Sequence, residues 1–552
     1  MNFKFKVILL LLPFFLFFGC KSYNDKTPSV SGHINDQDSW YNIEKDSVTV
    51  MNVTFNDPNE YLCSPYYNVL APQRGCTLDD INHDINPDDN YEPKLHVNMQ
   101  ALNFNTGSNY NASLKIKGGY SRTNIQKSYS IKLDSNENLY LEQRKFPLTK
   151  SQSDPSRLKN KVAFALLRQI PNITGLPVNF FHLYMNGVDY GLFNQPESIR
   201  EEYLIRRGWN KDDHIYNAVN FFFKYDDWSM AIDDKGEPKN PELFEEVIEI
   251  KNGKDHSKLI EMLHAIEDTD NIDDVVEKYF DRDNLLTWFA FNLVLSNKDT
   301  IQHNYYLYNP LFSNKFYFLP WDLDGSWESP QYLGKNEYGI GTWWELPLFR
   351  KFVSIKKNRD DLYAMADKIR NTYITDQNVR SLVNKYLPLV LPFQSTPPDS
   401  NYNSYDGCIA YSNKLVTRLQ ENVALYKSTI GDPMPFGQHV EYTDNKLKLM
   451  WDKSVDFEND PLAYNLEVTT IDDPNFMHPF IKEMAITDND PRIKVDTKGN
   501  FSLTQEFLLK PGKYLMKVTS YEINNPSHYQ ISFDRYDNGG IAYFGVLEFS
   551  IE

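Results

Sequence analysis

Cysteine is scarce in this chain, which has four cysteines in 552 residues. None of them lies in a Cys/His spacing that would bind zinc, so a structural zinc module is excluded. Basic residues are also in the minority, with 57 Lys and Arg against 75 Asp and Glu and a net charge of −18. A chain this acidic, without a strongly basic patch, does not fit the pattern of a nucleic-acid-binding protein, and we expect no such partner.

Long apolar runs are absent as well, except within residues 1–20. There, two lysines precede an apolar run that ends at Phe18, which is typical of a secretory signal and too short for a confident membrane span. The run closes on the sequence LFFGC, which resembles a bacterial lipoprotein box and implies cleavage before Cys20 and acylation of that residue. We therefore expect a signal peptide at 1–20, a polar tether at 21–40, and a lipid anchor in a bacterial membrane of the cell envelope, at the outer membrane or the cell surface.

The remaining cysteines fit an exported protein. Cys63 and Cys76 flank a loop that contains Pro, Gly and Asn, and in an oxidising compartment these two thiols can form a disulfide. Cys408 is then left over, and we expect it to be a buried thiol.

The hydrophobic pattern changes twice along the chain. It alternates with the period of strands from about 41 to 135, and a hairpin is predicted over 179–197 because Asn186-Gly187 is a strong turn signal. Helical patterns dominate from there to about 428. They include the segments 198–209, 241–250 and an apolar helix at 282–296. An earlier helix is predicted over 154–169, before the hairpin, with Asp154 as the expected cap and Pro155 as the first helical residue.

Strand alternation returns after residue 436 and continues to the end of the chain. Within it, Tyr514, Met516 and Val518 share one face after a Pro-Gly approach. The placement of Tyr514 resembles the tyrosine corner of fibronectin type III-like sandwiches. We predict a small all-β sandwich over 436–552.

The segment 297–327 carries the strongest chemical signal. Asp299 is followed by Asn304, then by two strand-like runs, and then by Asp322 and Asp324 in the sequence DLDG. Protein kinases show the same order, with an acid for the substrate hydroxyl, an amide for a metal, and a second acid for the metals after a strand. The alternative is an ordinary β-hairpin with capping acids, because Asp and Asn are common in turns.

A second signal is the glycine-containing turn between the strand patterns within 111–134. Backbone N–H groups of such a loop can approach a phosphate, and a nearby lysine can pair with it. The alternative is an ordinary hairpin with a surface lysine.

Five segments in this order resemble the CotH kinase family, over roughly residues 90–425. They are LKIKGGYSRTNIQKSYSIKL (114–133), SRLKNKVAFALLRQI (156–170), VNFFHLYMNGVDYGLFNQPESI (178–199), NKDTIQHNYYLY (297–308) and FYFLPWDLDGSW (316–327). The resemblance implies an α+β fold, specifically an atypical protein-kinase-like two-lobed domain over 41–435, followed by the sandwich. It also implies ATP, Mg²⁺ or Mn²⁺, and phosphate transfer to Ser/Thr hydroxyls of a protein substrate.

The resemblance also assigns roles to residues. Asp299 would be the catalytic base, and Asn304 and Asp322 would hold metal, with Asp324 competing for the role of Asp322. Either Lys127 or Lys132 would neutralise the nucleotide phosphates. The phosphate loop would comprise Gly118, Gly119, Ser121 and Arg122.

The sequence departs from the family pattern in three places. Lys117-Gly118 stands where the family usually has Arg-Gly, and Gln126-Lys127 stands where it has two lysines. The predicted helix 154–169 contains no Glu, so no ion-pair partner for the lysine can be named. An exported lipoprotein meets little ATP, so a rival function is a catalytically silent surface protein that binds glycan or protein. Transfer of AMP is a third possibility.

The anchor is testable directly. Replacing Cys20 with Ser removes the acylated thiol, and we expect the protein to leave the membrane fraction, because the short apolar run cannot hold it once cleaved. Fractionation followed by immunoblotting measures this. Unchanged membrane partition of the Cys20→Ser protein would contradict the lipoprotein interpretation.

Overall fold

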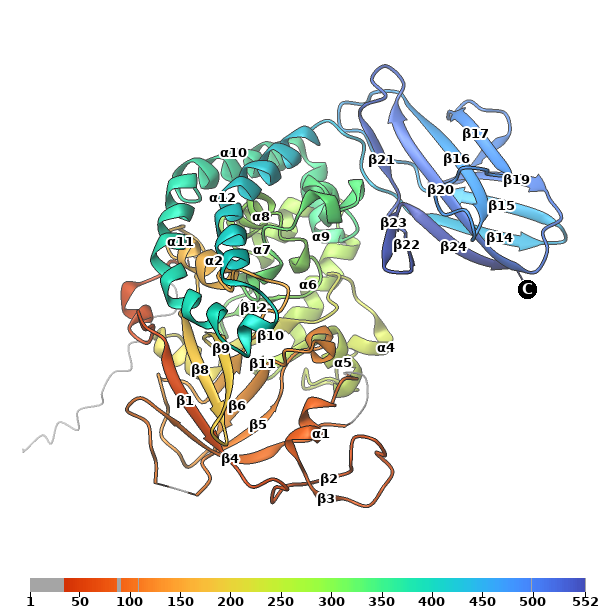
Figure 1. Cartoon of the computed structure of the whole chain (residues 1–552). Helices are drawn as coiled ribbons and strands as arrows, with labels where there is room; N and C mark the ends of the chain where they lie inside the picture. The colour runs from red at the N-terminus through yellow and green to blue at the C-terminus, as the bar shows by residue number, and fades with distance from the viewer. Residues whose placement is uncertain (1–33, 87–90, 108, 498, 552) are drawn as a thin grey trace, which may run out of the picture.

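The computed structural model describes residues 34–86, 91–107, 109–497 and 499–551 (Figure 1). The predicted signal peptide, Cys20 and most of the predicted tether lie outside these ranges. Helices and sheets alternate along the chain and build separate apolar cores, so the α+β class is confirmed. No helix among the described residues is both long enough and apolar enough to span a bilayer.

A seven-stranded sheet forms the N-terminal part, in the order β7-β6-β5-β4-β1-β8-β9. Neighbouring strands run antiparallel except β1 and β8, which are parallel. Asn186 and Gly187 both have positive φ and close the predicted hairpin between β8 and β9. The strands are β1 (Thr49–Thr54), β4 (Leu95–Ala101), β5 (Ala112–Ile116), β6 (Tyr129–Leu133), β7 (Lys145–Leu148), β8 (Val178–Met185) and β9 (Val188–Pro196).

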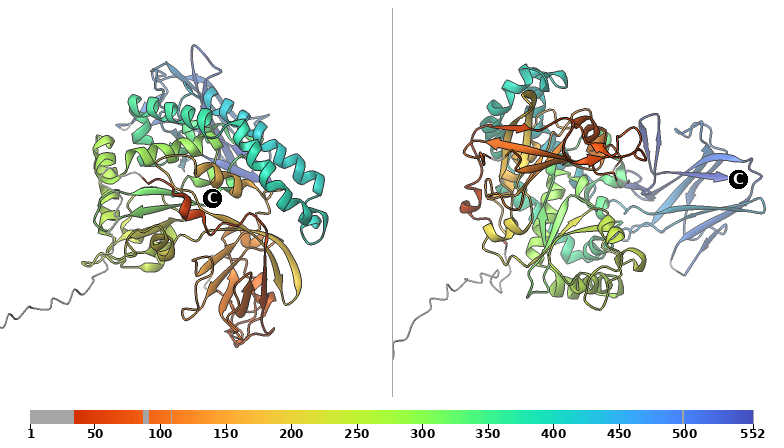
Figure 2. Two further views of the ribbon diagram at one scale, coloured as in Figure 1. Left: turned by 90° about the vertical axis from the view of Figure 1, so that its left-hand side faces the viewer. Right: turned by 90° about the horizontal axis from the view of Figure 1, so that it is seen from below.

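A second, antiparallel sheet has the order β11-β10-β12-β13. Its strands are β10 (His214–Ala218), β11 (Ile248–Asn252), β12 (Tyr305–Asn309) and β13 (Tyr317–Pro320). The N-terminal strands, red to orange, and the later helices, green to teal, gather at opposite ends of this part of the molecule (Figures 1 and 2).

Helix α8 (Arg282–Leu295) is the centre of the main apolar core. Every residue from Asn284 to Leu295 is buried, as its continuous apolar sequence predicts. Trp288 stacks on Phe318 of β13 at 4.4 Å between ring centroids, so the helix is fixed to the second sheet. The other helices are α1 (Leu78–Asn82), α2 (Lys159–Leu167), α3 (Glu201–Arg206), α4 (Asp227–Met230), α5 (Pro241–Val247), α6 (Ser257–Asp268), α7 (Ile272–Tyr279), α9 (Pro347–Ser354), α10 (Lys356–Thr372), α11 (Asp376–Val390) and α12 (Tyr405–Ser428).

Two predicted helices have different boundaries. The helix expected over 154–169 begins only at Lys159, because Arg157 takes a left-handed φ of 58° and Asp154 Oδ2 accepts the Lys159 N–H from outside the helix at 2.9 Å. The helix expected over 241–250 ends at Val247. Ile248 and Ile250 instead belong to β11, where their β-branched side chains suit pairing with β10. The predicted helix over 198–209 shortens to α3.

The residues after 436 form two larger sheets, β14-β15-β19-β18 and β17-β16-β20-β21, with β24 also paired to β20, and a separate two-stranded sheet of β22 and β23. Their facing sides share a core that includes Leu449, Tyr464 and Met516. Tyr514 Oη donates to Lys510 O at 2.9 Å, the bond expected of a tyrosine corner. The strands are β14 (Gln438–Thr443), β15 (Lys446–Trp451), β16 (Leu462–Thr470), β17 (Ile481–Ile486), β18 (Ile493–Val495), β19 (Phe501–Glu506), β20 (Gly512–Glu522), β21 (Tyr529–Ile531), β22 (Arg535–Asn538), β23 (Ile541–Phe544) and β24 (Val546–Ile551).

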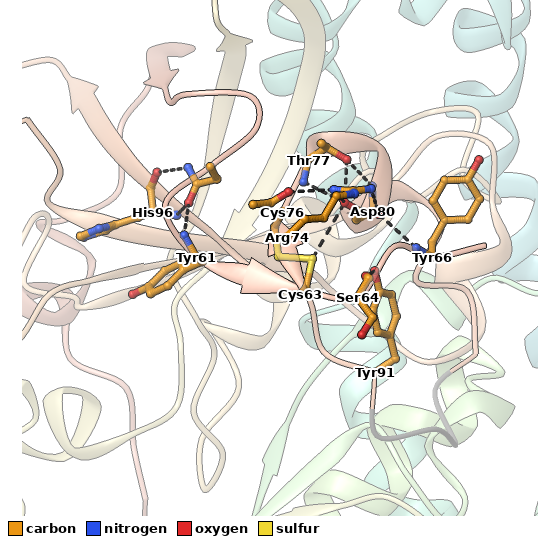
Figure 3. Close-up of a disulfide and its surroundings, with 12 residues drawn as sticks. Tyr61, Cys63, Ser64, Tyr66, Arg74, Cys76, Thr77, Asp80, Tyr91 and His96 are labelled. Atoms are coloured by element: carbon orange, nitrogen blue, oxygen red, sulfur yellow. Dashed lines mark hydrogen bonds and ion pairs between the residues drawn. A yellow bond between two sulfur atoms is a disulfide. The ribbon is translucent and has the colours of Figure 1, made fainter. Parts of the chain in front are cut away.

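Cys63 and Cys76 are joined in a disulfide beside the short pair β2 (Leu62–Cys63) and β3 (Arg74–Gly75) (Figure 3). Asp80 supports this corner, because its fully buried carboxylate binds the Arg74 guanidinium at 2.8 Å and caps α1 at Thr77. Cys408 is a buried free thiol, and burial raises its pKa to about 11.

Acid should destabilise the fold through His256. Burial of His256, which is 1% exposed, lowers its pKa from 6.5 to about 4, and its Nδ1 faces the Tyr216 hydroxyl at 2.9 Å. The unfolded chain therefore binds the proton more tightly, so this contribution to stability is lost as pH falls from 6.5 toward 4. From pH 7 to pH 5 we expect a loss of about 2 kcal/mol from this group.

Denaturant unfolding of the parent and His256→Gln at both pH values measures the effect. The free energy of unfolding of the parent, minus that of His256→Gln, should be about 2 kcal/mol lower at pH 5 than at pH 7. Replacement of the exposed His439 by Gln is the control, and parallel pH dependences of the parent and His256→Gln would contradict the assignment.

Candidate functional site

The loop after α8 places Asp299 and Asn304 side by side. Ser296 ends the helix in the left-handed conformation, and a 3-10 turn, η3 (Lys298–Thr300), then carries Asp299. Asn304 Nδ2 donates to one carboxylate oxygen of Asp299 at 2.7 Å, and His303 Nε2 lies 3.0 Å from the other. The Asp299 side chain remains 46% exposed, so it can meet a second molecule.

The DLDG segment packs directly on this loop. Asp322, with a left-handed φ of 47°, precedes the 3-10 turn η4 (Leu323–Gly325). A Cβ atom at Gly325 would lie 2.5 Å from the Cβ of Asp299, so only glycine lets the two turns approach this closely. Two acidic segments that are separated by the β12–β13 hairpin are thereby brought together.

Asp322 is held by groups from distant parts of the chain. Lys117 Nζ, at the end of β5, lies 3.7 Å from Asp322 Oδ2, and Asn160 Nδ2 donates to Oδ1 at 3.4 Å. The oxygen of the Asn160 side chain accepts the Leu323 N–H at 2.7 Å, so this single amide fixes both the carboxylate and the following turn.

Asp324 lies in the same turn and has unusual electrostatics. Burial, and after it the charge of Asp322, raises the pKa of Asp324 to about 7. The Lys159 ammonium donates to the Asp324 carbonyl oxygen at 3.0 Å and opposes this rise electrostatically. The charge of Asp322 beside Asp324 makes the site favourable for a cation.

The donor set fits a hard divalent cation that shares its coordination with a phosphate. Within the described residues, no three His, Cys, Asp or Glu side chains converge closely enough to hold a metal by themselves. Asp322 and Asp324 offer carboxylate oxygens, and Asn304 offers its amide oxygen, because its nitrogen is used by Asp299. Mg²⁺ is commonly bound by one or two carboxylates together with substrate phosphates, which matches this incomplete set.

Hydrogen bonds from the side chains of Ser121 and Arg122 hold the glycine loop in shape. Gly118 has a φ of 96°, and Ser121 Oγ donates to Lys117 O at 3.2 Å. Arg122 donates to Gly118 O at 2.6 Å and pairs with Asp84 at 2.6 Å, so its guanidinium holds the loop in shape. A Cβ at Gly119 would meet no atom within 4 Å, which leaves this backbone open to a ligand.

The structure separates the two candidate lysines. Lys127 lies at the base of the loop, where its ammonium donates to Arg122 O, and burial lowers its pKa. Lys132 is exposed, and its register partner on β5 is Ser113. Ser113 lies four residues before Lys117 along the chain. At about 3.3 Å per residue that is roughly 13 Å along the strand, so Lys132 is not part of the cluster around Asp322.

A further group of cations lies on the face of the N-terminal sheet that carries Lys132. Lys145 on β7 pairs in register with Lys132, on the side of the sheet opposite the apolar core. Burial lowers the pKa of Lys145 to about 7, and the charges of Arg200, Lys251 and Lys115 add to the effect. Lys115 and Lys251 are themselves paired with Glu92 and Glu249, so this face carries charges of both signs.

Sequence reasoning missed Lys117, Lys159 and Asn160. Lys117 occupies the place of the family's usual arginine and pairs with Asp322. Lys159 and Asn160 are 3% and 2% exposed at the start of α2. The signal that could have found them is three consecutive polar residues, KNK (159–161), at the start of an otherwise apolar helix, because buried polar groups need partners.

The fold and site together define an α+β protein with an acid and amide loop packed against a second acidic turn and faced by a lysine. The sequence matches the CotH kinase protein family over residues 114–428, more than half of the chain, and the protein belongs to that family.

Two individual proteins show more limited similarity. The inner spore coat protein H of Bacillus subtilis (strain 168) is 27% identical over 267 residues, covering 48% of this chain and 69% of that protein. A solved chain from the complex of Shewanella oneidensis MR-1 HipA and HipB with operator DNA has 12% identity and a TM-score of 0.24. The match covers 62% of this chain and 66% of that one, and such a low score carries no argument about the fold.

Asn160 should be essential to the shape of the site. Its replacement by Leu leaves the buried Leu323 N–H without an acceptor, and we expect a loss of about 1–3 kcal/mol in the free energy of unfolding. The matched control is Asn105→Leu, which removes the same kind of side-chain acceptor from the exposed Gly107 N–H at 3.1 Å. Water replaces that bond, so a change within about 0.5 kcal/mol is expected. Equal stability of Asn160→Leu and the parent in denaturant titrations would contradict the role.

Proposed function

We propose that this protein is an ATP- and metal-dependent protein kinase of the cell envelope, anchored by a lipid on Cys20, with an atypical kinase-like two-lobed domain over 41–435. Membership of the CotH kinase family supports the class. The observation that carries the proposal is the contact of the Asp299–Asn304 pair with the Asp322 turn, opposite Lys117. The residues after 436 would form the fibronectin type III-like module.

The geometry supports a division of labour between the acids. Asp299 is exposed and oriented by Asn304, so it would accept the proton of an incoming hydroxyl and orient that hydroxyl. Asp322, Asp324 and the Asn304 amide oxygen would hold Mg²⁺ or Mn²⁺, and the bound metal would neutralise charge on the phosphates.

The remaining groups would hold the nucleotide. Lys117 lies within reach of the same carboxylate and would move its charge to a phosphate oxygen when the metal binds Asp322. The open backbone at Gly119 and the half-buried Lys127 would cover the phosphates.

The two acids should fail differently when replaced. Asp299→Asn should bind metal and ATP nearly as well as the parent, yet lose transfer by about 10²–10⁴-fold, because the proton acceptor is gone. Asp322→Asn should weaken metal-dependent ATP binding itself, because an anionic ligand is removed from a hard cation. Calorimetry with and without Mg²⁺, beside a radiolabel transfer assay, separates the roles.

The exposed Asp212→Asn protein is the matched control and should behave as the parent. Intact-mass measurement identifies the transferred group, because a phosphoryl unit adds about 80 Da. If the parent binds no ATP at millimolar metal, the kinase proposal is wrong. If Asp324→Asn is harmful and Asp322→Asn is not, the metal ligand within the pair is Asp324.

A further inference from the structure

The last two sheets contact the part of the chain that supports Asp299. The strands β21 and β23 lie on the side of the blue module that faces the helices (Figure 1). Phe544, at the end of β23, packs so closely on Gly334 that a Cβ there would lie 2.5 Å from its ring. Lys335 pairs with Asp432, which is 2% exposed, and its ammonium lies 4.9 Å from the centre of the Tyr529 ring in β21.

A second contact reinforces this interface. Phe457, in the loop after β15, lies edge-on to Trp344 with 5.7 Å between ring centroids. The Arg359 guanidinium of α10 lies 3.7 Å from the centre of the Phe457 ring. Aromatic and cation–π contacts on both sides of the junction oppose free movement of the module.

The segment held by the module reaches the catalytic loop within two residues. Lys335 begins the 3-10 turn η6 (Lys335–Glu337), and Glu337 ends it. One carboxylate oxygen of Glu337 accepts the Gly334 N–H at 2.9 Å, and the same carboxylate binds the Lys298 ammonium at 3.2 Å. Lys298 immediately precedes Asp299 in η3.

The loop and this segment also pack together tightly. They enclose a cavity of about 10 Å³ whose lining includes Asn297, Lys298, Glu337 and Asn422. That is about the space of a single water molecule, so the two segments lie close together here.

We propose that the C-terminal module positions Asp299 through η6, and that Glu337 and Lys335 are positioning residues for the transfer reaction. This inference rests on the proposed function for its kinetic consequence, but its structural consequence is measurable without activity. The route is a continuous series of contacts from Tyr529 and Phe544, through Gly334 to Glu337, and on to Lys298.

The test uses the full-length protein and two readouts. Lys335→Met removes the ammonium at the module side and touches neither Asp299 nor its loop. We expect the kcat of transfer to fall about 3- to 30-fold with an unchanged KM for ATP, the range typical of coupling mutations. Hydrogen exchange of the peptide 296–304 should become faster, because η3 loses its support.

Further variants separate positioning from folding. Phe544→Ala breaks the other module contact without leaving Asp432 unpaired, and should give the same two changes if Lys335→Met folds poorly. Lys335→Arg and Lys298→Arg keep the ion pairs and should restore parent behaviour. Lys513→Met is the control, because Lys513 pairs with Glu548 on an exposed part of the module.

Each outcome decides one claim. Lys298→Met removes the ammonium that binds Glu337. If it changes kcat and the hydrogen exchange of 296–304 but Lys335→Met and Phe544→Ala change neither, the module does not position the loop and the proposal is wrong. If the parent transfers nothing but the module variants still expose 296–304, the positioning stands and the proposed function fails. If the parent is active and exchange of 296–304 is unchanged in both module variants, only the inference fails.

Discussion

The close packing of two acidic turns, one carrying Asp299 and the other Asp322 and Asp324, is the constraint on which the rest of the site depends. Asp299, Asp322 and Asp324 lie on two turns in van der Waals contact, and the charges of the other two acids contribute to the raised pKa of Asp324. Such a group of anions is stable in a folded chain only where donors and cations surround it. The donors come from α2, from the end of β5 and from the loop itself, so the two turns are held from separate segments.

A rigid support lies beneath these turns. Helix α8 is buried on every side, and the Trp327 N–H donates to Leu295 O at 2.9 Å, which ties the end of the DLDG segment to the end of the helix. Asn284 donates to Phe318 O at 3.2 Å and accepts from its N–H at 2.7 Å, which fixes the helix to β13 at the other end. Functional side chains that are anchored to packed elements keep their geometry better than side chains on free loops.

The parts that followed from the sequence are those with a local cause. The β8–β9 hairpin forms because Asn186-Gly187 suits its turn, and α8 is buried because its sequence is apolar all round. The contact of Asp299 with Asn304 spans five residues and lies within reach of a short loop. These features depend on neighbours along the chain, whose chemistry a single sequence displays.

The parts that did not follow have long-range causes. Asn160 meets Asp322 across 162 positions, and no local pattern shows which turn its amide will serve. The start of α2 moved to Lys159 because the buried Arg157 donates to Ser151 O at 2.6 Å, which holds the chain out of the helix. The choice between Lys127 and Lys132 depended on strand register, which is set by pairing across the sheet.

The position of β1 has a consequence for how the chain folds. This strand pairs with β4 on one side and, in parallel, with β8 on the other, more than a hundred residues later. Until residue 185 is available, one edge of β1 is open, and an open edge strand invites pairing with other chains. The disulfide between Cys63 and Cys76 closes across only 13 positions and can form before that edge is covered. We therefore expect the β8–β9 hairpin to join this sheet late, because long-range parallel pairing is intrinsically slow.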